Sequence, residues 1–281
     1  MKPERIEFEG ADGITLIADA WGEQDAHPVL FLHGGGQTRH SWGGAASLLA
    51  GKGWRTFSID LRGHGDSSWS PEGNYEADDF VADINAVLAR LDKRAVLVGA
   101  SLGGRTATLV VGNGEPEHCR ALVLVDITPK IEIRGVERIL SFMNKNPDGF
   151  ATVEEAAASV AAYRQHRSPP RDVTGLKKNL RQKGDGRWYW HWDPVFLKRS
   201  YPHEAATSQD FSEAAARINI PTLLVRGGGS DVVSPANVRD FMKLVPHAKY
   251  VDIADAGHMV AGDKNDAFTQ GIVEFLYHSF G

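Results

Sequence analysis

A serine held between glycines is the first feature of this chain that could do chemistry. Ser101 lies in the segment GASLG, residues 99–103, after an apolar run and before a helical pattern. This spacing matches G-x-S-x-G, in which a strand turns sharply into a helix and lifts the serine hydroxyl out of the sheet. A serine hydroxyl is a weak nucleophile until a base takes its proton. The segment therefore predicts attack on a carbonyl carbon by an activated serine.

An activated serine needs a base and an acid that orients the base. The candidate base is His258, which follows the last expected strand and precedes the last expected helix. Two aspartates at strand ends compete for the acid: Asp231 in a glycine-rich segment and Asp126 at the end of an apolar run. Either aspartate satisfies the order serine, aspartate, histidine along the chain. We favour Asp231, because a glycine-rich loop can reach a histidine, and keep Asp126 as the alternative.

Acyl transfer also needs hydrogen-bond donors for the oxyanion that develops on the substrate. The run HGGG, residues 33–36, follows an apolar segment and carries glycines whose backbone N–H groups can face a substrate. We expect the N–H groups of Gly35 and Leu102 to be the donors. The register is open by one residue, so Gly34 or Gly36 could take the place of Gly35.

The elements that must position these residues alternate along the chain. The first 22 residues form two alternating segments around Asp12-Gly13, which predicts a hairpin. Short apolar runs then alternate with amphipathic helical patterns, as in residues 75–92 and 265–280. Such alternation predicts an α/β fold with a mostly parallel sheet and helices on both faces.

The alternation stops between residues 129 and 208, where helical patterns occur without a clear buried strand. We predict a core of residues 1–128 and 209–281, with residues 129–208 as a mainly helical cap. Residues 129–210 carry 14 Lys and Arg against 10 Asp and Glu, and the remainder carries 17 against 26. Two interpretations remain open: a solvated helical surface, or a basic inner face that attracts an anionic substrate.

Several residues near these segments are candidates for lining a substrate pocket. Gln37, His40 and Trp42 follow the glycine run. Trp190 and Trp192 belong to the aromatic run of residues 187–196, which either packs the cap onto the core or shapes a cavity for an apolar group.

These segments together resemble the α/β-hydrolase superfamily over essentially the whole chain. The likeness rests on HGGG, DLRGHGDSSW, GASLGG, RGGGSD and AGHMVAGD. It implies an eight-stranded sheet whose second strand is antiparallel, a cap at residues 129–208, and a structural role for Arg62 and His64. The chain looks closest to the branch of epoxide hydrolases, haloperoxidases and carbon–carbon bond hydrolases. It differs from epoxide hydrolases and haloalkane dehalogenases, because Ser101 stands where they carry an aspartate.

Composition excludes several other classes. A net charge of −5 gives no basic excess for nucleic acid, and the single Cys119 cannot form an internal disulfide. No phosphate-binding or dinucleotide-binding fingerprint occurs. Without a secretory signal or a long apolar stretch, we expect a cytoplasmic monomer or homodimer that does not engage membranes. We expect no metal and no organic cofactor.

The sequence thus predicts a serine hydrolase that cleaves a small or medium carboxylic ester or lactone through an acyl-enzyme. Three alternatives stay open: carbon–carbon hydrolysis of a β-diketone-like acid, cofactor-free perhydrolysis, and a ligand sensor without turnover.

Overall fold

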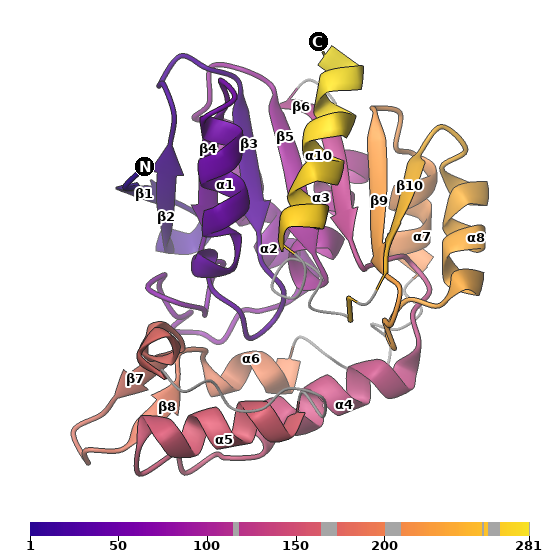
Figure 1. The fold of residues 1–281 in the computed structure, drawn as a ribbon. Helices are drawn as coiled ribbons and strands as arrows, with labels where there is room; N and C mark the ends of the chain where they lie inside the picture. Colours follow the sequence, from indigo (N-terminus) through magenta and orange to yellow (C-terminus); the bar gives the residue numbers. More distant parts are fainter. Residues whose placement is uncertain (115–117, 164–172, 200–208, 255, 258–264, 281) are drawn as a thin grey trace.

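The computed structural model describes residues 1–114, 118–163, 173–199, 209–254, 256–257 and 265–280. Figure 1 shows two layers of structure: a sheet covered by helices on both faces, and beneath one end of it a second group of helices with a small hairpin.

The sheet has eight strands in the order β1-β2-β4-β3-β5-β6-β9-β10. Strand β2 is antiparallel to β1 and β4, and the other neighbouring pairs are parallel. This confirms the predicted fold, including the antiparallel second strand. The strands are β1 (Glu4–Glu9), β2 (Thr15–Trp21), β3 (Pro28–Leu32), β4 (Arg55–Ile59), β5 (Ala95–Ala100), β6 (Cys119–Val125), β9 (Thr222–Gly227) and β10 (Lys249–Ile253).

The central strands are apolar throughout because both faces of the sheet are covered. In β3, Val29 and Phe31 join the core on one face, and Leu30 and Leu32 join the core on the other. Helices α1 (Gly43–Ala50) and α10 (Asn265–Phe280) cover the first face, in front of the sheet in Figure 1. The second face is covered by α2 (Ala77–Leu88), α3 (Leu102–Asn113), α7 (Gln209–Ala216) and α8 (Pro235–Leu244).

The chain between β6 and β9 forms the second group in Figure 1. It contains α4 (Ile133–Asn144), α5 (Val153–Tyr163), the 3-10 helix η4 (Thr174–Asn179), β7 (Leu180–Gln182), β8 (Trp188–Trp190) and α6 (Pro194–Arg199). Strands β7 and β8 pair antiparallel, a feature that the sequence did not predict, because three-residue strands are too short to show periodicity. Helix α7 packs against α3 in the core. Residues 200–208, where the predicted cap ends, lie outside the described residues, so the boundary stays a prediction, and we use the name cap for the described part of residues 129–208.

Two further 3-10 helices lie in the core: η1 (Ala11–Gly13), between β1 and β2, and η2 (Arg39–Trp42), after the glycine run. None of the helices within the described residues combines the length and the apolar character needed to cross a bilayer.

Candidate active site

Ser101 stands in a sharp turn between β5 and α3. Its backbone has φ 47° and ψ −113°, a conformation that is strained for a residue with a side chain. A Cβ atom added to Gly99 would lie 2.4 Å from the carbonyl oxygen of Gly103. One added to Gly103 would lie 2.3 Å from the carbonyl oxygen of Leu32. The two glycines therefore permit the close passage of the chain that the motif predicts.

Helix α3 begins directly after the serine. Leu102 is its first residue, so the Leu102 N–H has no acceptor four residues earlier within the helix. The Gly103 N–H donates to the carbonyl oxygen of His33 at 3.1 Å, which ties the start of the helix to the end of β3. The helix thus presents the Leu102 N–H and its positive end next to Ser101.

The glycine run that follows β3 lies beside the serine. Strand β3 pairs with β5, with Leu32 opposite Gly99. A Cβ atom added to Gly34 would lie 3.4 Å from the Cβ atom of Ser101. The structure therefore brings together the two segments from which the sequence predicts the oxyanion donors. We call residues 34–36 the glycine loop.

The N–H groups of the glycine loop have different partners. The Gly34 N–H donates to Oε1 of Gln37 at 2.9 Å, and the Gly36 N–H donates to Nε2 of His64 at 3.1 Å. Among the hydrogen bonds of the described residues, none is donated by the Gly35 N–H. This pattern favours Gly35 over its neighbours as the donor. It also shows that the side-chain oxygen of Gln37 supports the loop.

Asp126 lies at the end of the strand next to the nucleophile. The Ser101 N–H donates to the carbonyl oxygen of Val125 at 3.4 Å, so the aspartate follows the residue that the serine contacts. Asp126 is fully buried and has φ 51°. Its carboxylate accepts hydrogen bonds from the Gly227 N–H at 3.1 Å and from the Ser230 hydroxyl. A buried carboxylate held in a strained backbone is typical of a functional position.

Asp231, the favoured acid of the sequence, lies in a different environment. Its side chain is about one-third exposed (36%) and pairs with Arg138 of α4 at 2.8 Å. His258 lies outside the described residues, so neither aspartate has a measured distance to it. Burial, strain and closeness to β5 favour Asp126 as the acid.

Two residues after the glycine loop that the sequence suggests as pocket-lining, His40 and Trp42, lie in different environments. Trp42 is buried in the core between Phe31 and Phe268, with ring centroids 5.4 and 5.5 Å away. It packs helix α1 against the sheet and α10, so the structure corrects the prediction that it lines a pocket. His40 keeps 29% of its side chain exposed and lies 3.6 Å from Asp19. Burial, followed by the nearby Arg39 guanidinium, lowers the pKa of His40.

The aromatic run packs mainly within the cap. Trp190 and Trp192 stack with ring centroids 5.0 Å apart, and Trp190 also meets Phe150 edge-on. A Cβ atom added to Gly36 would lie 3.4 Å from Cζ3 of Trp192. Trp190 therefore belongs to the packing of the cap, and Trp192 belongs both to that packing and to the surroundings of the glycine loop.

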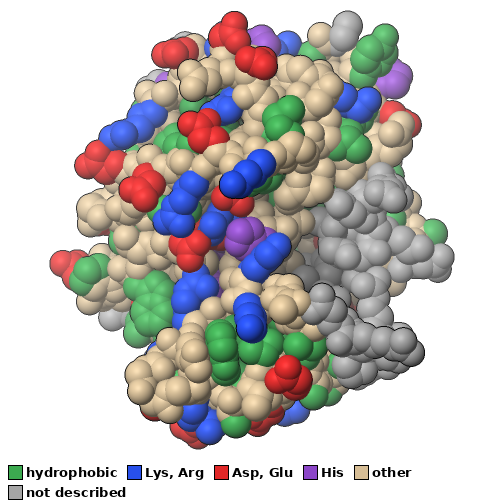
Figure 2. Space-filling view, turned by 60° about the vertical axis from the view of Figure 1, so that its left-hand side comes forward, with side chains coloured by type: hydrophobic (Ala, Val, Ile, Leu, Met, Phe, Trp, Pro, Cys, Tyr) green, Lys and Arg blue, Asp and Glu red, His purple; other side chains and the backbone are tan. Residues whose placement is uncertain are grey.

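Ion pairs join the cap to the core. Arg138 pairs with Asp231, Arg181 of β7 pairs with Asp66, and Lys130 pairs with Asp240. Figure 2, which shows one face of the molecule, has side chains of both signs gathered where the upper and lower layers meet. Three cations of the cap, Lys130, Arg138 and Arg181, thus pair with acidic residues of the core and stabilise the cap–core contact.

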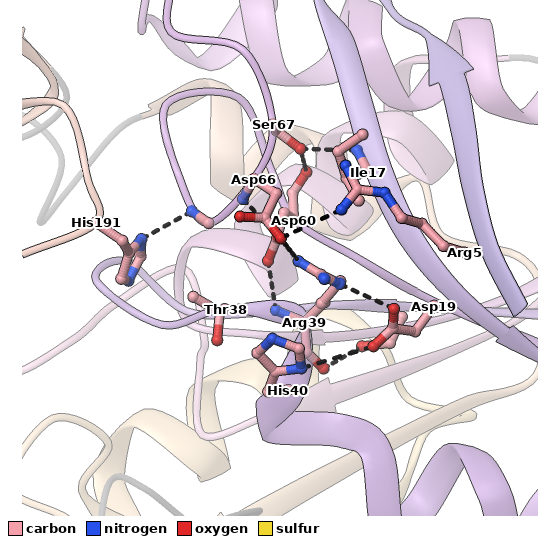
Figure 3. A network of polar contacts seen from close by, with 12 residues as sticks. Arg5, Ile17, Asp19, Thr38, Arg39, His40, Asp60, Asp66, Ser67 and His191 are labelled. Atoms are coloured by element: carbon pink, nitrogen blue, oxygen red, sulfur yellow. Dashed lines mark hydrogen bonds and ion pairs between the residues drawn. The ribbon is translucent and has the colours of Figure 1, made fainter. Parts of the chain in front are cut away.

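A buried charge network holds the chain that follows the glycine loop. The Arg39 guanidinium pairs with Asp60 at the end of β4 and with Asp19 of β2, 3.0 Å away (Figure 3). The Arg39 N–H also donates to Asp60, at 2.6 Å. Arg62 forms a second buried pair with Asp83, at 2.7 and 2.8 Å. These contacts fit the structural role that the resemblance implies for residues 60–69.

Sequence reasoning missed a group of buried histidines around the glycine loop. The sequence assigns no role to His33 or His191, because no local pattern records that their rings bind backbone groups of the glycine loop. Burial lowers the pKa of His33 to about 4. Burial and the nearby His33 lower the pKa of His64 to about 3. Burial lowers the pKa of His191 well below its usual value. All three rings are therefore neutral at pH 7.

These buried histidines predict acid lability. In the unfolded chain their pKa is near 6.5, so between pH 6.5 and about 4 the unfolded state binds protons that the folded state does not. The free energy of unfolding should fall as the pH is lowered through this window, with each histidine contributing up to about 1.4 kcal/mol per pH unit. Urea titrations at pH 7.5, 6 and 5 measure the effect while most carboxylates stay ionised. In His64→Asn the slope should be shallower, and a wild-type stability independent of pH would contradict the interpretation.

Comparison with known proteins adds an independent finding. A family profile described as the alpha/beta hydrolase fold matches residues 27–264. The chain is similar to an esterase of Mycobacterium tuberculosis, with 30% identity over 279 residues that cover 94% of this chain and 87% of the esterase. It is similar to a non-heme chloroperoxidase of Kitasatospora aureofaciens, with 29% identity over 94% of this chain and 97% of the peroxidase.

Solved structures give the same architecture. The crystal structure of E-2-(acetamidomethylene)succinate hydrolase matches with a TM-score of 0.84 over 98% of this chain and 99% of that chain. The two sequences are 24% identical, so this likeness shows the fold.

Proposed function

The chain belongs to the alpha/beta-hydrolase family, and on that premise we propose that it is a serine hydrolase acting on a small or medium carboxylic ester or lactone. The observation that carries the proposal is the geometry of Ser101. The serine stands in a strained turn at the end of β5, next to the start of α3 and beside the glycine loop. Such a turn places a nucleophile between two backbone donors for an oxyanion.

In the proposed reaction the Ser101 hydroxyl attacks the carbonyl carbon and its proton passes to His258. The oxyanion that forms accepts hydrogen bonds from the N–H groups of Gly35 and Leu102. Collapse of the tetrahedral intermediate expels the alcohol, which takes the proton from His258 and leaves an acyl group on Ser101. Water then attacks the acyl-enzyme, with His258 as base, and releases the acid and the free serine.

We assign the orienting acid to Asp126, with Asp231 as the alternative. The carboxylate of Asp126 is buried and held by Gly227 and Ser230, whereas that of Asp231 is partly exposed and paired with Arg138. A buried, immobile carboxylate is the better partner for an imidazole, because it fixes one tautomer and stabilises the imidazolium. No metal ion or organic cofactor is needed for this scheme.

The likeness to a non-heme chloroperoxidase favours one second candidate. In a perhydrolase the same acyl-enzyme forms, and hydrogen peroxide in place of water attacks it to give a peracid and the free serine. The two reactions share the site that binds the ester. They differ in the molecule that attacks the acyl-enzyme, which is water in one and hydrogen peroxide in the other. Carbon–carbon hydrolysis of a β-diketone-like acid stays a further candidate, since the chain is also 29% identical over 226 residues to a 2-(acetamidomethylene)succinate hydrolase of Mesorhizobium japonicum.

A substrate panel tests the proposal. The wild-type protein should hydrolyse p-nitrophenyl acetate and at least one compound in a set of aliphatic esters, aryl esters and lactones, and a fluorophosphonate should label Ser101. Parallel assays with β-diketo acids, and with esters plus hydrogen peroxide, report the other reactions. Absence of both turnover and labelling across the whole panel would favour a ligand sensor without catalysis.

A further inference from the structure

The carbonyl groups of the glycine loop are held by histidines. His33 Nδ1 lies 2.8 Å from the carbonyl oxygen of Gly34, and His191 Nε2 lies 3.2 Å from the carbonyl oxygen of Gly36. On the other side of Gly36 its N–H donates to His64. Both polar backbone groups of Gly36 are thus bound to imidazole rings. The N–H of Gly35, the proposed oxyanion donor, shares its peptide with the Gly34 carbonyl group, so His33 holds that peptide on one side and the bound Gly36 holds the residue that follows it.

The hydrogen bonds of each ring determine its tautomer. The Gly65 N–H donates to Nδ1 of His191 at 2.8 Å (Figure 3). Because Nδ1 of His191 is an acceptor, its Nε2 must carry the proton that is donated to the Gly36 carbonyl oxygen. By the same reasoning His64, which accepts from Gly36 through Nε2, donates through Nδ1 to the carbonyl oxygen of Arg62 at 3.0 Å. Protonation of either ring would remove the accepted hydrogen bond.

His191 differs from the other two histidines because it belongs to the cap. It follows β8 and is fully buried between the glycine loop and the chain after β4. The ring centroids of His64 and His191 are 5.8 Å apart. The cap therefore supplies one of the groups that define the conformation of the glycine loop.

Other contacts seat this part of the cap on the core without touching residues 34–36. Thr38 donates to Asn179 at 3.0 Å, and the Asp193 N–H donates to the carbonyl oxygen of Gly63 at 2.9 Å. The Tyr75 hydroxyl donates to the Asp193 carboxylate at 2.6 Å. These contacts anchor the cap without bonding to the glycine loop, whereas His191 makes a hydrogen bond to the loop that carries the oxyanion donor.

We propose that His191 is a positioning residue for the oxyanion hole, so that the cap completes the catalytic machinery in addition to covering it. The inference rests on the proposed function, since it requires that Gly35 binds an oxyanion. The ring bridges the Gly65 N–H and the Gly36 carbonyl oxygen and thereby holds the end of the loop that follows the Gly35 N–H, while His33 holds the Gly34 carbonyl oxygen of the donor peptide itself. Without the bridge the donor shifts relative to the transition state, while the substrate pocket itself is retained.

Substitutions of His191 test the proposal in the full-length protein with p-nitrophenyl acetate. His191→Phe keeps the shape of the ring and removes both polar atoms, so kcat should fall about 10- to 100-fold, with KM changed by less than about threefold. His191→Gln retains one acceptor and one donor and should recover most of kcat. His191→Asn, whose shorter amide cannot span from Gly65 to Gly36, should show the loss again.

Tyr75→Phe is the matched control, because it removes the hydrogen bond to Asp193 in the same cap–core contact, together with the acceptor of the Ser70 N–H, but removes no hydrogen bond of the glycine loop. It should lower the thermal midpoint and keep kcat within about twofold, since a remote anchor affects stability more than positioning. Equal losses of kcat in the Tyr75 and His191 variants, or wild-type kcat in folded His191→Phe, would overturn the proposal. If His191→Phe does not fold, the contrast between His191→Asn and His191→Gln decides.

The same measurements separate this inference from the proposed function. Inactive wild type, or full turnover in Ser101→Ala, contradicts the serine mechanism itself. Active wild type and inactive Ser101→Ala, together with unaffected His191 variants, contradict only the role of His191.

Discussion

Ser101→Ala should lower kcat for p-nitrophenyl acetate by about 10⁶-fold, because loss of a nucleophile leaves only the oxyanion donors and substrate binding to act. Single-turnover assays with active-site titration measure the residual rate, and fluorophosphonate labelling should disappear. The thermal midpoint should change little, since the side chain of Ala is close in size to that of Ser and meets the same strain at φ 47°. Turnover of Ser101→Ala at the wild-type rate would contradict the mechanism.

Ser101→Gly provides a matched control for the role of backbone strain. It should be as inactive as Ser101→Ala, but more stable by about 1–2 kcal/mol, because glycine adopts this backbone conformation without the steric cost. Urea unfolding of the two variants measures the difference. A glycine variant no more stable than the alanine variant would mean that the turn is not strained in solution.

Asp126→Asn should lower kcat by about 10⁴-fold, because the amide favours the wrong tautomer of the catalytic histidine and does not stabilise its imidazolium. Asp231→Asn should cost less than about fivefold, since it removes only a partly exposed ion pair with Arg138. Steady-state kinetics of both variants at pH 8, with circular dichroism to check folding, provide the comparison.

A large loss of kcat in Asp231→Asn with little loss in Asp126→Asn would instead identify Asp231, the residue that the sequence favours, as the orienting acid. A large loss in both variants would have a different meaning. Asp126 also accepts hydrogen bonds from Gly227 and Ser230, so its replacement can displace the loop that carries Asp231. The double variant distinguishes these cases, because two residues that act as one unit give a combined loss close to that of either single change.

Local patterns were sufficient to predict most of the fold. The apolar runs of β3, β5, β6 and β9 and the amphipathic pattern of α2 identify the sheet and its covering helices, since burial on both faces dictates composition. The sharp turn at Ser101 was equally predictable, because only glycine fits where Gly99 and Gly103 pass close to other backbone atoms. The β7–β8 hairpin could not be predicted, because its three-residue strands are too short to show an alternation of apolar and polar residues.

Long-range contacts decided the rest. Trp42 follows the glycine run, as a residue that lines a pocket would. In the structure its ring packs between Phe31 and Phe268, and Phe268 lies more than 200 positions further along the chain. The role of His191 depends on hydrogen bonds to Gly36 and Gly65, and no local pattern around it records those partners.

The sequence by itself therefore determined the sheet and the turn at Ser101, the proposed nucleophile, together with the glycine loop beside it, because strand ends, turns and burial leave signals within a few residues. Only the tertiary structure distinguished the buried Asp126 from the ion-paired Asp231 and joined the cap to the glycine loop through His191. Burial, partners and tautomers are properties of a site that distant segments build together, so they exist only once the chain has folded.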